Sequence, residues 1–101
     1  MSSAAELDPV IHAPLRLQVC ALLSATDEAE FALIREETGV SDSVLSKHVK
    51  QLEEAGYVRV RKATLASRQR TWLSLTKAGA RAFQAHVRAL TALAGSTFKA
   101  G

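Results

Sequence analysis

The order of apolar and polar positions along the chain predicts four helical segments and one pair of strands. Residues 10–23 are apolar around most of a helical surface, and Pro14 marks a second helix start or a kink within them. A polar break at residues 24–28 separates this segment from a short helix over residues 30–38, which Gly39 ends as a C-cap. A helix that is apolar nearly all round needs more than one packing partner, so we expect residues 10–23 to contact several other elements.

The next helix is expected over residues 42–55 and has two unlike faces. Leu45, Val49 and Leu52 recur with i, i+4, i+7 spacing, which places them on one side, and Gly56 ends the helix. Two helices joined by a tight glycine-containing turn, the second apolar on one side only, are typical of a helix-turn-helix. The opposite side carries short hydroxyls and lysines: Ser43, Ser46, Lys47 and Lys50.

Two short segments downstream, residues 57–61 and 71–75, alternate apolar and polar side chains as half-buried strands do. We expect them to pair as a hairpin whose tip, residues 63–70, is too long for a tight turn. Thr76 then supplies an N-cap for a final helix that runs to about residue 94. The predicted fold is mainly α with a small antiparallel β-hairpin. The final helix has an apolar stripe formed by Phe83, Val87, Leu90 and Leu93.

Composition favours one soluble domain. The 101 residues are 48% hydrophobic and 23% charged, and the five aromatic residues are too few to favour a β-sandwich core. Residues 1–8 lack the cationic and apolar regions of a signal peptide, and no apolar run approaches the roughly 18 residues of a membrane span. Cys20 is the single cysteine, which excludes an intrachain disulfide and favours a reducing compartment. We therefore expect a cytoplasmic protein without membrane association.

The net charge of +3 averages over two unlike halves of the chain. Residues 1–42 carry two basic and eight acidic side chains, a net charge of −6, whereas residues 43–101 carry eleven basic and two acidic ones, a net charge of +9. The cationic half contains the helix over residues 42–55 and the hairpin, which predicts a nucleic-acid-binding surface. The serines and lysines of that helix suit the major groove, and Arg68 and Arg70 of the hairpin suit the adjacent minor groove.

Three stretches of the sequence resemble the MarR/ArsR-like winged helix regulators of bacteria and archaea. Residues 39–58, GVSDSVLSKHVKQLEEAGYV, are similar to the recognition-helix segment of that family. Residues 68–79, RQRTWLSLTKAG, look like its second wing strand and the entry to its last helix. Residues 7–16, LDPVIHAPLR, are similar to the opening helix of its small single-domain members. The resemblance covers about residues 7–94 and implies a winged helix-turn-helix fold.

The resemblance also implies a function, which is sequence-specific binding of double-stranded DNA by a transcriptional regulator, with repression favoured. A homodimer through the first and last helices would bind a pseudo-palindromic operator. Ser67 stands where many relatives have an acidic residue before the wing-tip arginine, which leaves the wing geometry open, and Tyr57 replaces a more usual leucine. The sequence names no cofactor, and any small-molecule effector is unknown. The candidate DNA-binding residues are Ser41, Asp42, Ser43, Ser46, Lys47, Lys50, Lys62, Arg68 and Arg70.

The domain bounds follow from the same features. Asp8 and Pro9 predict the first helix start, as N-cap and first-turn proline. We expect a flexible tail over residues 1–6, the winged helix domain with its dimerisation helices over residues 7–95, and a second tail over residues 96–101.

Several side chains allow a second interpretation. Cys20 is either a packing residue, which its apolar neighbours favour, or a redox-sensing thiol. Trp72 is expected to anchor the sheet to a helix rather than to bind a ligand. Three histidines fall on three different helices without the spacing of metal ligands, which disfavours a metal site: His12, His48 and His86.

The main alternative function is a winged helix module that docks an acidic protein partner without sequence-specific DNA binding. No paired-carboxylate site, activated nucleophile or glycine-rich phosphate loop stands out, so we expect a protein that is not an enzyme.

Overall fold

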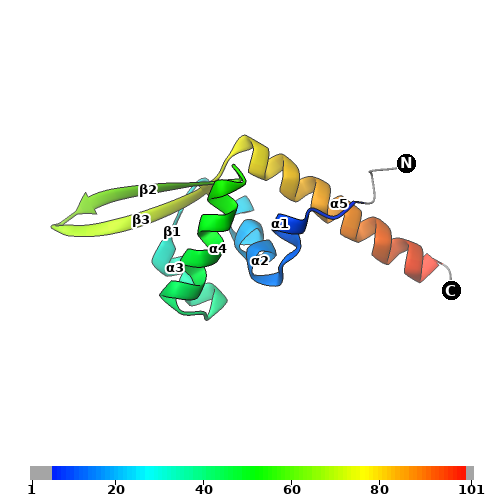
Figure 1. Ribbon diagram of the computed structural model, residues 1–101, viewed down its shortest axis with the longest axis horizontal. Helices are drawn as coiled ribbons and strands as arrows, with labels where there is room; N and C mark the ends of the chain where they lie inside the picture. Colours follow the sequence, from blue (N-terminus) through cyan, green and yellow to red (C-terminus); the bar gives the residue numbers. More distant parts are fainter. Residues whose placement is uncertain (1–5, 100–101) are drawn as a thin grey trace.

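Each predicted helix is present in the computed structural model, which describes residues 6–99. Asp8 caps the first helix because its side chain accepts hydrogen bonds from the backbone N–H groups of Val10 and Ile11. Residues 1–5, 100 and 101 of the predicted tails lie outside the described residues. In chain order the elements are α1 (Pro9–His12), α2 (Pro14–Ser24), β1 (Ala29–Glu30), α3 (Phe31–Thr38), α4 (Asp42–Glu54), β2 (Val58–Leu65), β3 (Arg68–Leu75) and α5 (Lys77–Lys99) (Figure 1).

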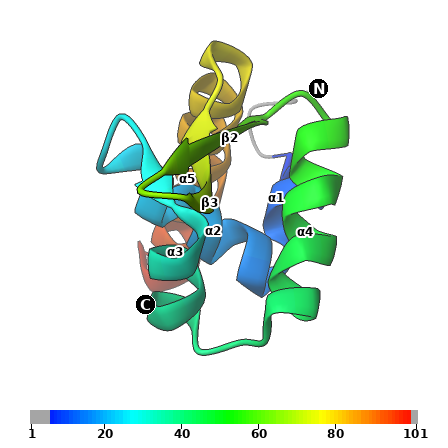
Figure 2. The ribbon, with the colours of Figure 1, turned by 90° about the vertical axis from the view of Figure 1, so that its left-hand side faces the viewer.

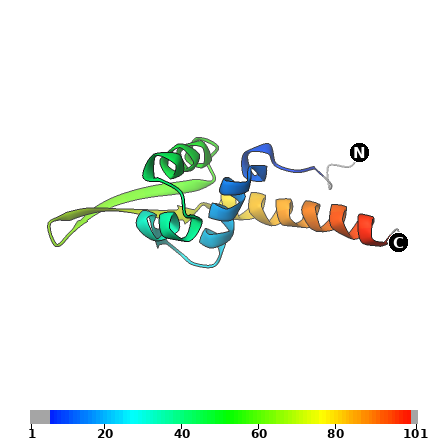
Figure 3. The ribbon, with the colours of Figure 1, turned by 90° about the horizontal axis from the view of Figure 1, so that it is seen from below.

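The molecule is elongated, with the helices α1 to α4 in the middle. Figure 1 shows the hairpin of β2 and β3 extending to one end and α5 to the other, and Figure 3 shows the same arrangement from below. Viewed along the hairpin, α4 lies to its right and α3 below it (Figure 2). Helix α5 continues to Lys99, beyond residue 95, where the sequence places the end of the domain. No helix in residues 6–99 has both the length and the apolar character that a membrane crossing requires.

The hairpin differs from the sequence prediction. Strands β2 and β3 stay paired from Val58 opposite Leu75 to Leu65 opposite Arg68, so the predicted long tip over residues 63–70 is wrong. The turn consists of Ala66 and Ser67 alone, with φ angles of 51° and 66°. Two successive positive φ angles match the right-handed twist of paired strands, but they are usually signalled by Asn or Gly, which this turn lacks.

A third strand, β1, was not predicted from the sequence. Its two residues pair antiparallel with β3, Ala29 opposite Leu73 and Glu30 opposite Trp72, giving the strand order β1-β3-β2. A two-residue strand is too short to show alternation. Its partner lies more than forty positions away, so only the tertiary structure reveals it.

The core forms around α2, which contacts α1, α3, α4, α5 and β3. This confirms that the helix with apolar residues all round packs against several elements. Burial raises the pKa of the Cys20 thiol to about 11, with a smaller contribution from Asp8, so the thiol stays protonated and packs as a small apolar side chain. The largest fully buried side chains are Ile11, Val19, Cys20, Leu23, Ile34, Leu45, Leu52, Leu73 and His86.

Asp8 joins three parts of the fold. Its backbone N–H donates to Nδ1 of His86 on α5 at 3.0 Å, and its Oδ2 accepts a hydrogen bond from the Tyr57 hydroxyl at 2.6 Å. His86 is only 1% exposed, and its Nε2 lies 3.4 Å from Nδ1 of His12 on α1. Because Nδ1 accepts from Asp8, the neutral His86 ring carries its proton on Nε2, which faces His12.

The histidine contact was not expected, since the sequence places His12 and His86 on separate helices 74 positions apart. A metal bound between the rings would need the Nε2 lone pair of His86, whereas Asp8 fixes the proton on that nitrogen. In residues 6–99 no group of three or more His, Cys, Asp and Glu residues is placed to hold a metal ion.

The start of α5 is fixed against the residues that follow α4. Thr76 caps α5, because its hydroxyl accepts from the Gly79 backbone N–H at 2.9 Å and donates to the Gly56 carbonyl at 2.6 Å. Gly79 is buried beneath Tyr57, and a Cβ at this position would lie 2.0 Å from the Tyr57 carbonyl oxygen. The close approach of the two backbones therefore requires glycine at position 79.

We expect Gly79→Ala to lower the free energy of unfolding by about 3 kcal/mol, because backbone atoms cannot move aside as a flexible side chain can. Gly95→Ala is the matched control, since a Cβ there meets no atom within 4 Å. It is expected to raise stability by about 0.5–1 kcal/mol, as alanine does in a helix interior. Urea unfolding measures both values, and equal effects of the two substitutions would contradict the close approach.

The pKa of His86 is lowered mainly by burial and further by His12. The pKa of His48 is also lowered mainly by burial, with a smaller contribution from the positive charge of Arg16. The folded chain therefore resists protonation that the unfolded chain accepts below the ordinary histidine pKa of about 6.5. We expect the free energy of unfolding to fall as the pH drops from about 7.5 to about 5.5.

His86→Gln is expected to reduce this pH dependence, whatever it does to stability at neutral pH. Urea unfolding of both proteins across the pH range measures the two slopes. The same slope in the variant and the wild type would show that His86 does not contribute.

Candidate nucleic-acid interface

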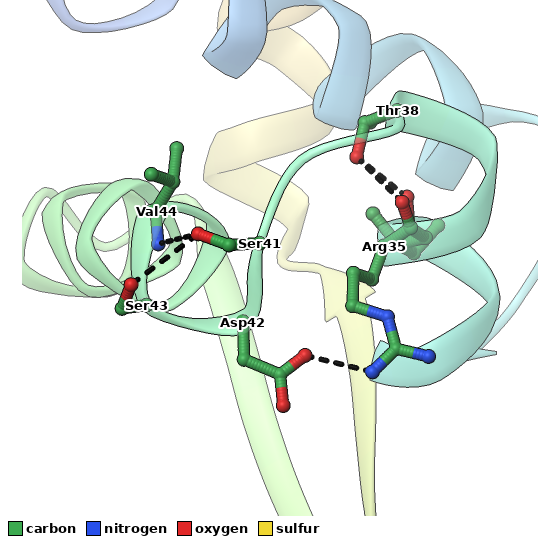
Figure 4. A network of polar contacts seen from close by, with 7 residues as sticks. Arg35, Thr38, Ser41, Asp42, Ser43 and Val44 are labelled. Carbon is green, nitrogen blue, oxygen red and sulfur yellow. Dashed lines mark hydrogen bonds and ion pairs between the residues drawn. The ribbon is translucent and has the colours of Figure 1, made fainter.

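The turn between α3 and α4 is built from local signals. Gly39 ends α3 in the left-handed conformation, with φ of 74°, and its N–H donates to the Arg35 carbonyl. Ser41 then caps α4, because its hydroxyl accepts from the Val44 N–H at 3.3 Å (Figure 4). The Ser41 hydroxyl also lies 3.3 Å from that of Ser43. Of the predicted site residues, Ser41 thus has a structural role at the start of the helix.

An ion pair holds the two helices of the motif together at this end. Arg35 of α3 donates to the Asp42 carboxylate at 2.8 Å, and both side chains remain partly exposed (Figure 4). Asp42 in the first turn of α4 also complements the helix dipole. Asp42 is among the residues predicted to face DNA, whereas its pairing with Arg35 was not predicted from the sequence.

The two faces of α4 are separated as predicted. Leu45, Val49 and Leu52 are buried, whereas Ser43, Ser46, Lys47 and Lys50 are exposed. Within the described part of the chain, no hydrogen bond or ion pair engages the last three of these exposed side chains. The helix therefore presents two lysines and a serine hydroxyl that a ligand can contact directly.

The flank of α4 nearer the core is held by Arg16 of α2. Its guanidinium lies 3.0 Å from Nδ1 of His48 and donates to the Gln51 side chain and to the Val10 carbonyl. Since Arg16 carries a permanent positive charge, the neutral His48 ring acts as the acceptor. This role of Arg16 was not predicted from the sequence. His48 and Gln51, three positions apart on one flank of the helix, are the signal that could have indicated a shared partner.

The hairpin brings one predicted site residue, Lys62, close to the exposed face of α4. Lys62 is exposed on β2 and lines a hollow of about 320 Å³ together with Ser46 and Lys50 of α4. The hollow lies between the helix and the hairpin. Three of the candidate DNA-binding residues therefore converge, although they come from two different elements.

Arg68 and Arg70 differ in their surroundings. Arg68 is exposed, directly after the turn, whereas the guanidinium of Arg70 pairs with the Glu30 carboxylate at 3.0 Å. Both arginines line a second hollow, which also contains Arg35 and Asp42 from the helix-turn-helix. Of these two arginines, Arg68 is thus the one without an ion-pair partner among the described residues.

A further hairpin arginine, Arg61, is also paired with the acidic half of the chain. It donates two hydrogen bonds of 2.8 Å to the Glu28 carboxylate and lies 5.5 Å from the Trp72 ring centre. The hydrogen bonds from Arg61 hold the pKa of Glu28 below its ordinary value. Fewer cationic side chains are therefore available to bind a ligand than the net charge of +9 on residues 43–101 suggests.

Comparisons with known proteins agree with this geometry. The family model of the winged helix DNA-binding domain matches residues 15–94. The chain is 30% identical over 78 residues to an uncharacterized protein of Methanocaldococcus jannaschii, MJ0432, which covers 77% of this chain and 85% of that protein.

Two solved structures have the same fold. A transcriptional regulator homologue from Pyrococcus horikoshii OT3 superimposes with a TM-score of 0.82 at 25% identity, over 87% of each chain. HlyU from Vibrio cholerae superimposes with a TM-score of 0.63 at 22% identity, over 74% of this chain and 77% of that one. The family match at residues 15–94 extends over the helix-turn-helix, the hairpin and most of the last helix.

Proposed function

The chain belongs to the winged helix DNA-binding domain family, and on that premise we propose that it regulates transcription as a homodimer bound to a pseudo-palindromic operator. One observation carries the proposal. Ser46, Lys47 and Lys50 are exposed on α4 and have no hydrogen-bond or ion-pair partner among residues 6–99, opposite the buried stripe that fixes the helix. Such a face can enter the major groove without first breaking contacts within the protein.

The proposed DNA contacts fall into two groups, those to base edges and those to backbone phosphates. Ser43, Ser46 and Lys47 on the exposed face of α4 read base edges, because short hydroxyls and lysine amines match donor and acceptor groups in the major groove. Lys50 and Lys62, which share a hollow with Ser46, contact backbone phosphates.

The remaining candidates have supporting or flanking roles. Arg68 at the hairpin turn enters the neighbouring minor groove. Ser41 and Asp42 position the start of α4 through the cap and the Arg35 pair. Arg70 sets the angle of the hairpin through its pair with Glu30.

The apolar stripe of α5 supports the proposed dimer. Val87 is 40% exposed and Leu93 is 46% exposed on a helix that projects away from the domain (Figure 1). Phe83 and Leu90 of the predicted stripe are half-buried. Exposed apolar side chains on a projecting helix are costly in a monomer and favour a second copy against α5 and the first helices. Two-fold symmetry then places two α4 helices in major-groove half-sites about 10 base pairs apart.

Repression is the proposed mode of regulation, since a dimer on an operator excludes other proteins from that DNA. The side chains proposed to contact DNA do not indicate an effector.

Lys50→Ala is expected to weaken binding to all duplexes and to reduce the slope of log affinity against log salt by about one, because one phosphate contact is lost. Arg88→Ala on α5 removes the same charge away from α4 and the hairpin, and should leave the slope unchanged once sedimentation has shown that the variant is still a dimer. Fluorescence anisotropy at several salt concentrations measures both slopes. An unchanged slope for Lys50→Ala would exclude the phosphate contact.

Selection of binding sites from random duplexes tests the proposed function as a whole. We expect an inverted repeat with half-sites about one helical turn apart. Sedimentation of the protein alone should give a dimer at micromolar concentration. A monomer, or selection without a preferred sequence, would contradict the proposal, and the second result would favour a module that docks an acidic protein partner.

A further inference from the structure

A cavity of about 490 Å³ lies away from α4, between α2, α3, β1 and β3. We call it the Trp72 cavity. Its apolar lining includes Leu22, Leu33, Ile34 and the Trp72 ring. The volume is within the range of small-molecule sites, which are mostly apolar with a few polar groups that orient the ligand.

Trp72, which lines the cavity, also carries a buried polar group, its indole N–H. Its Nε1 is the one buried side-chain nitrogen or oxygen without a hydrogen-bond partner in the described part of the chain. Buried tryptophan N–H groups usually have an acceptor. Because Nε1 is buried, a ligand acceptor reaches it only when neighbouring side chains move aside.

The charged groups that line the cavity are all acidic. Glu28 and Glu30 are already paired with Arg61 and Arg70 on the hairpin. Glu37 of α3 has no ion pair or hydrogen bond with any described residue. The Trp72 cavity therefore has one uncompensated carboxylate at an apolar site, which favours a cation over an anion.

We propose that the Trp72 cavity binds an aliphatic amine that also carries an aromatic ring and a hydrogen-bond acceptor. The aromatic ring packs against Leu22 and Leu33, the acceptor receives the Trp72 N–H, and the protonated amine lies beside Glu37. The site uses none of the side chains proposed to contact DNA. A ligand there contacts both α3 of the helix-turn-helix and β3 of the hairpin.

Trp72 is the single tryptophan of the chain, so its indole N–H gives one signal in a ¹H–¹⁵N spectrum of the full-length protein. The probe is lidocaine, which combines a dimethylphenyl ring, an amide carbonyl and a tertiary amine that is protonated at neutral pH. We expect saturable movement of the indole proton signal to lower field as the carbonyl accepts the hydrogen bond. The control compound, N-(2,6-dimethylphenyl)acetamide, keeps the ring and the carbonyl but lacks the amine, and should bind more weakly.

Three variants locate the site. Glu37→Gln should weaken lidocaine binding about two- to fivefold, the effect expected for one partly exposed ion pair. Leu33→Lys places a cation at the cavity and should abolish binding. Leu65→Lys is the matched control, because Leu65 on the hairpin is 51% exposed, compared with 50% for Leu33, and does not line the cavity.

An indole signal that lidocaine does not move would overturn the proposal. Equal affinity for lidocaine and the neutral control would overturn the assignment of a cationic ligand. Unchanged binding by Leu33→Lys would exclude this cavity as the site. None of these measurements involves DNA, so their outcome is independent of the test of the regulatory function.

Discussion

The burial of one apolar stripe on α4 determines which of its side chains face outward. Leu45 and Leu52 are fully buried and Val49 is 5% exposed, so rotating the helix about its axis would bring several of these groups into water. Fully burying such a side chain contributes about 1.5–3 kcal/mol, which far exceeds the energy of an exposed serine or lysine contact. The hydrophobic effect thus fixes the orientation of Ser46, Lys47 and Lys50, and Arg16 fixes the flank of the same helix.

Ion pairs within the chain reduce the cationic surface. Glu28 and Glu30, from the acidic half, pair with Arg61 and Arg70 of the hairpin. These pairs are partly exposed and contribute little to stability individually, but each occupies a guanidinium that could otherwise contact phosphate. They also tie the hairpin to the segment around β1. Among the cations that remain unpaired, Lys50 and Lys62 share a hollow with Ser46 on the exposed face of α4.

The contacts of Asp8 connect the recognition region to the helix proposed for dimerisation. Through its backbone N–H and carboxylate, Asp8 joins His86 of α5 to Tyr57, which directly precedes the hairpin. Because Gly79 has no side chain, the backbone at the start of α5 can contact the backbone of the same tyrosine. The angle at which α5 leaves the domain is therefore set next to the helix-turn-helix, and that angle governs the spacing of two α4 helices in the proposed dimer.

Local chemistry in the sequence determined the helices, their caps and the two faces of α4. Asp8, Ser41 and Thr76 cap helices because their side chains reach N–H groups two or three residues away, and Gly39 ends α3 for an equally local reason. The tertiary structure alone decided the two-residue turn at Ala66 and Ser67, because the twist of the paired strands imposes positive φ angles that these residues do not signal. It also decided the pairing of Arg70 with Glu30 and the contact of His12 with His86, since each joins residues at least forty positions apart. Such contacts depend on how the elements pack, which no short stretch of sequence specifies.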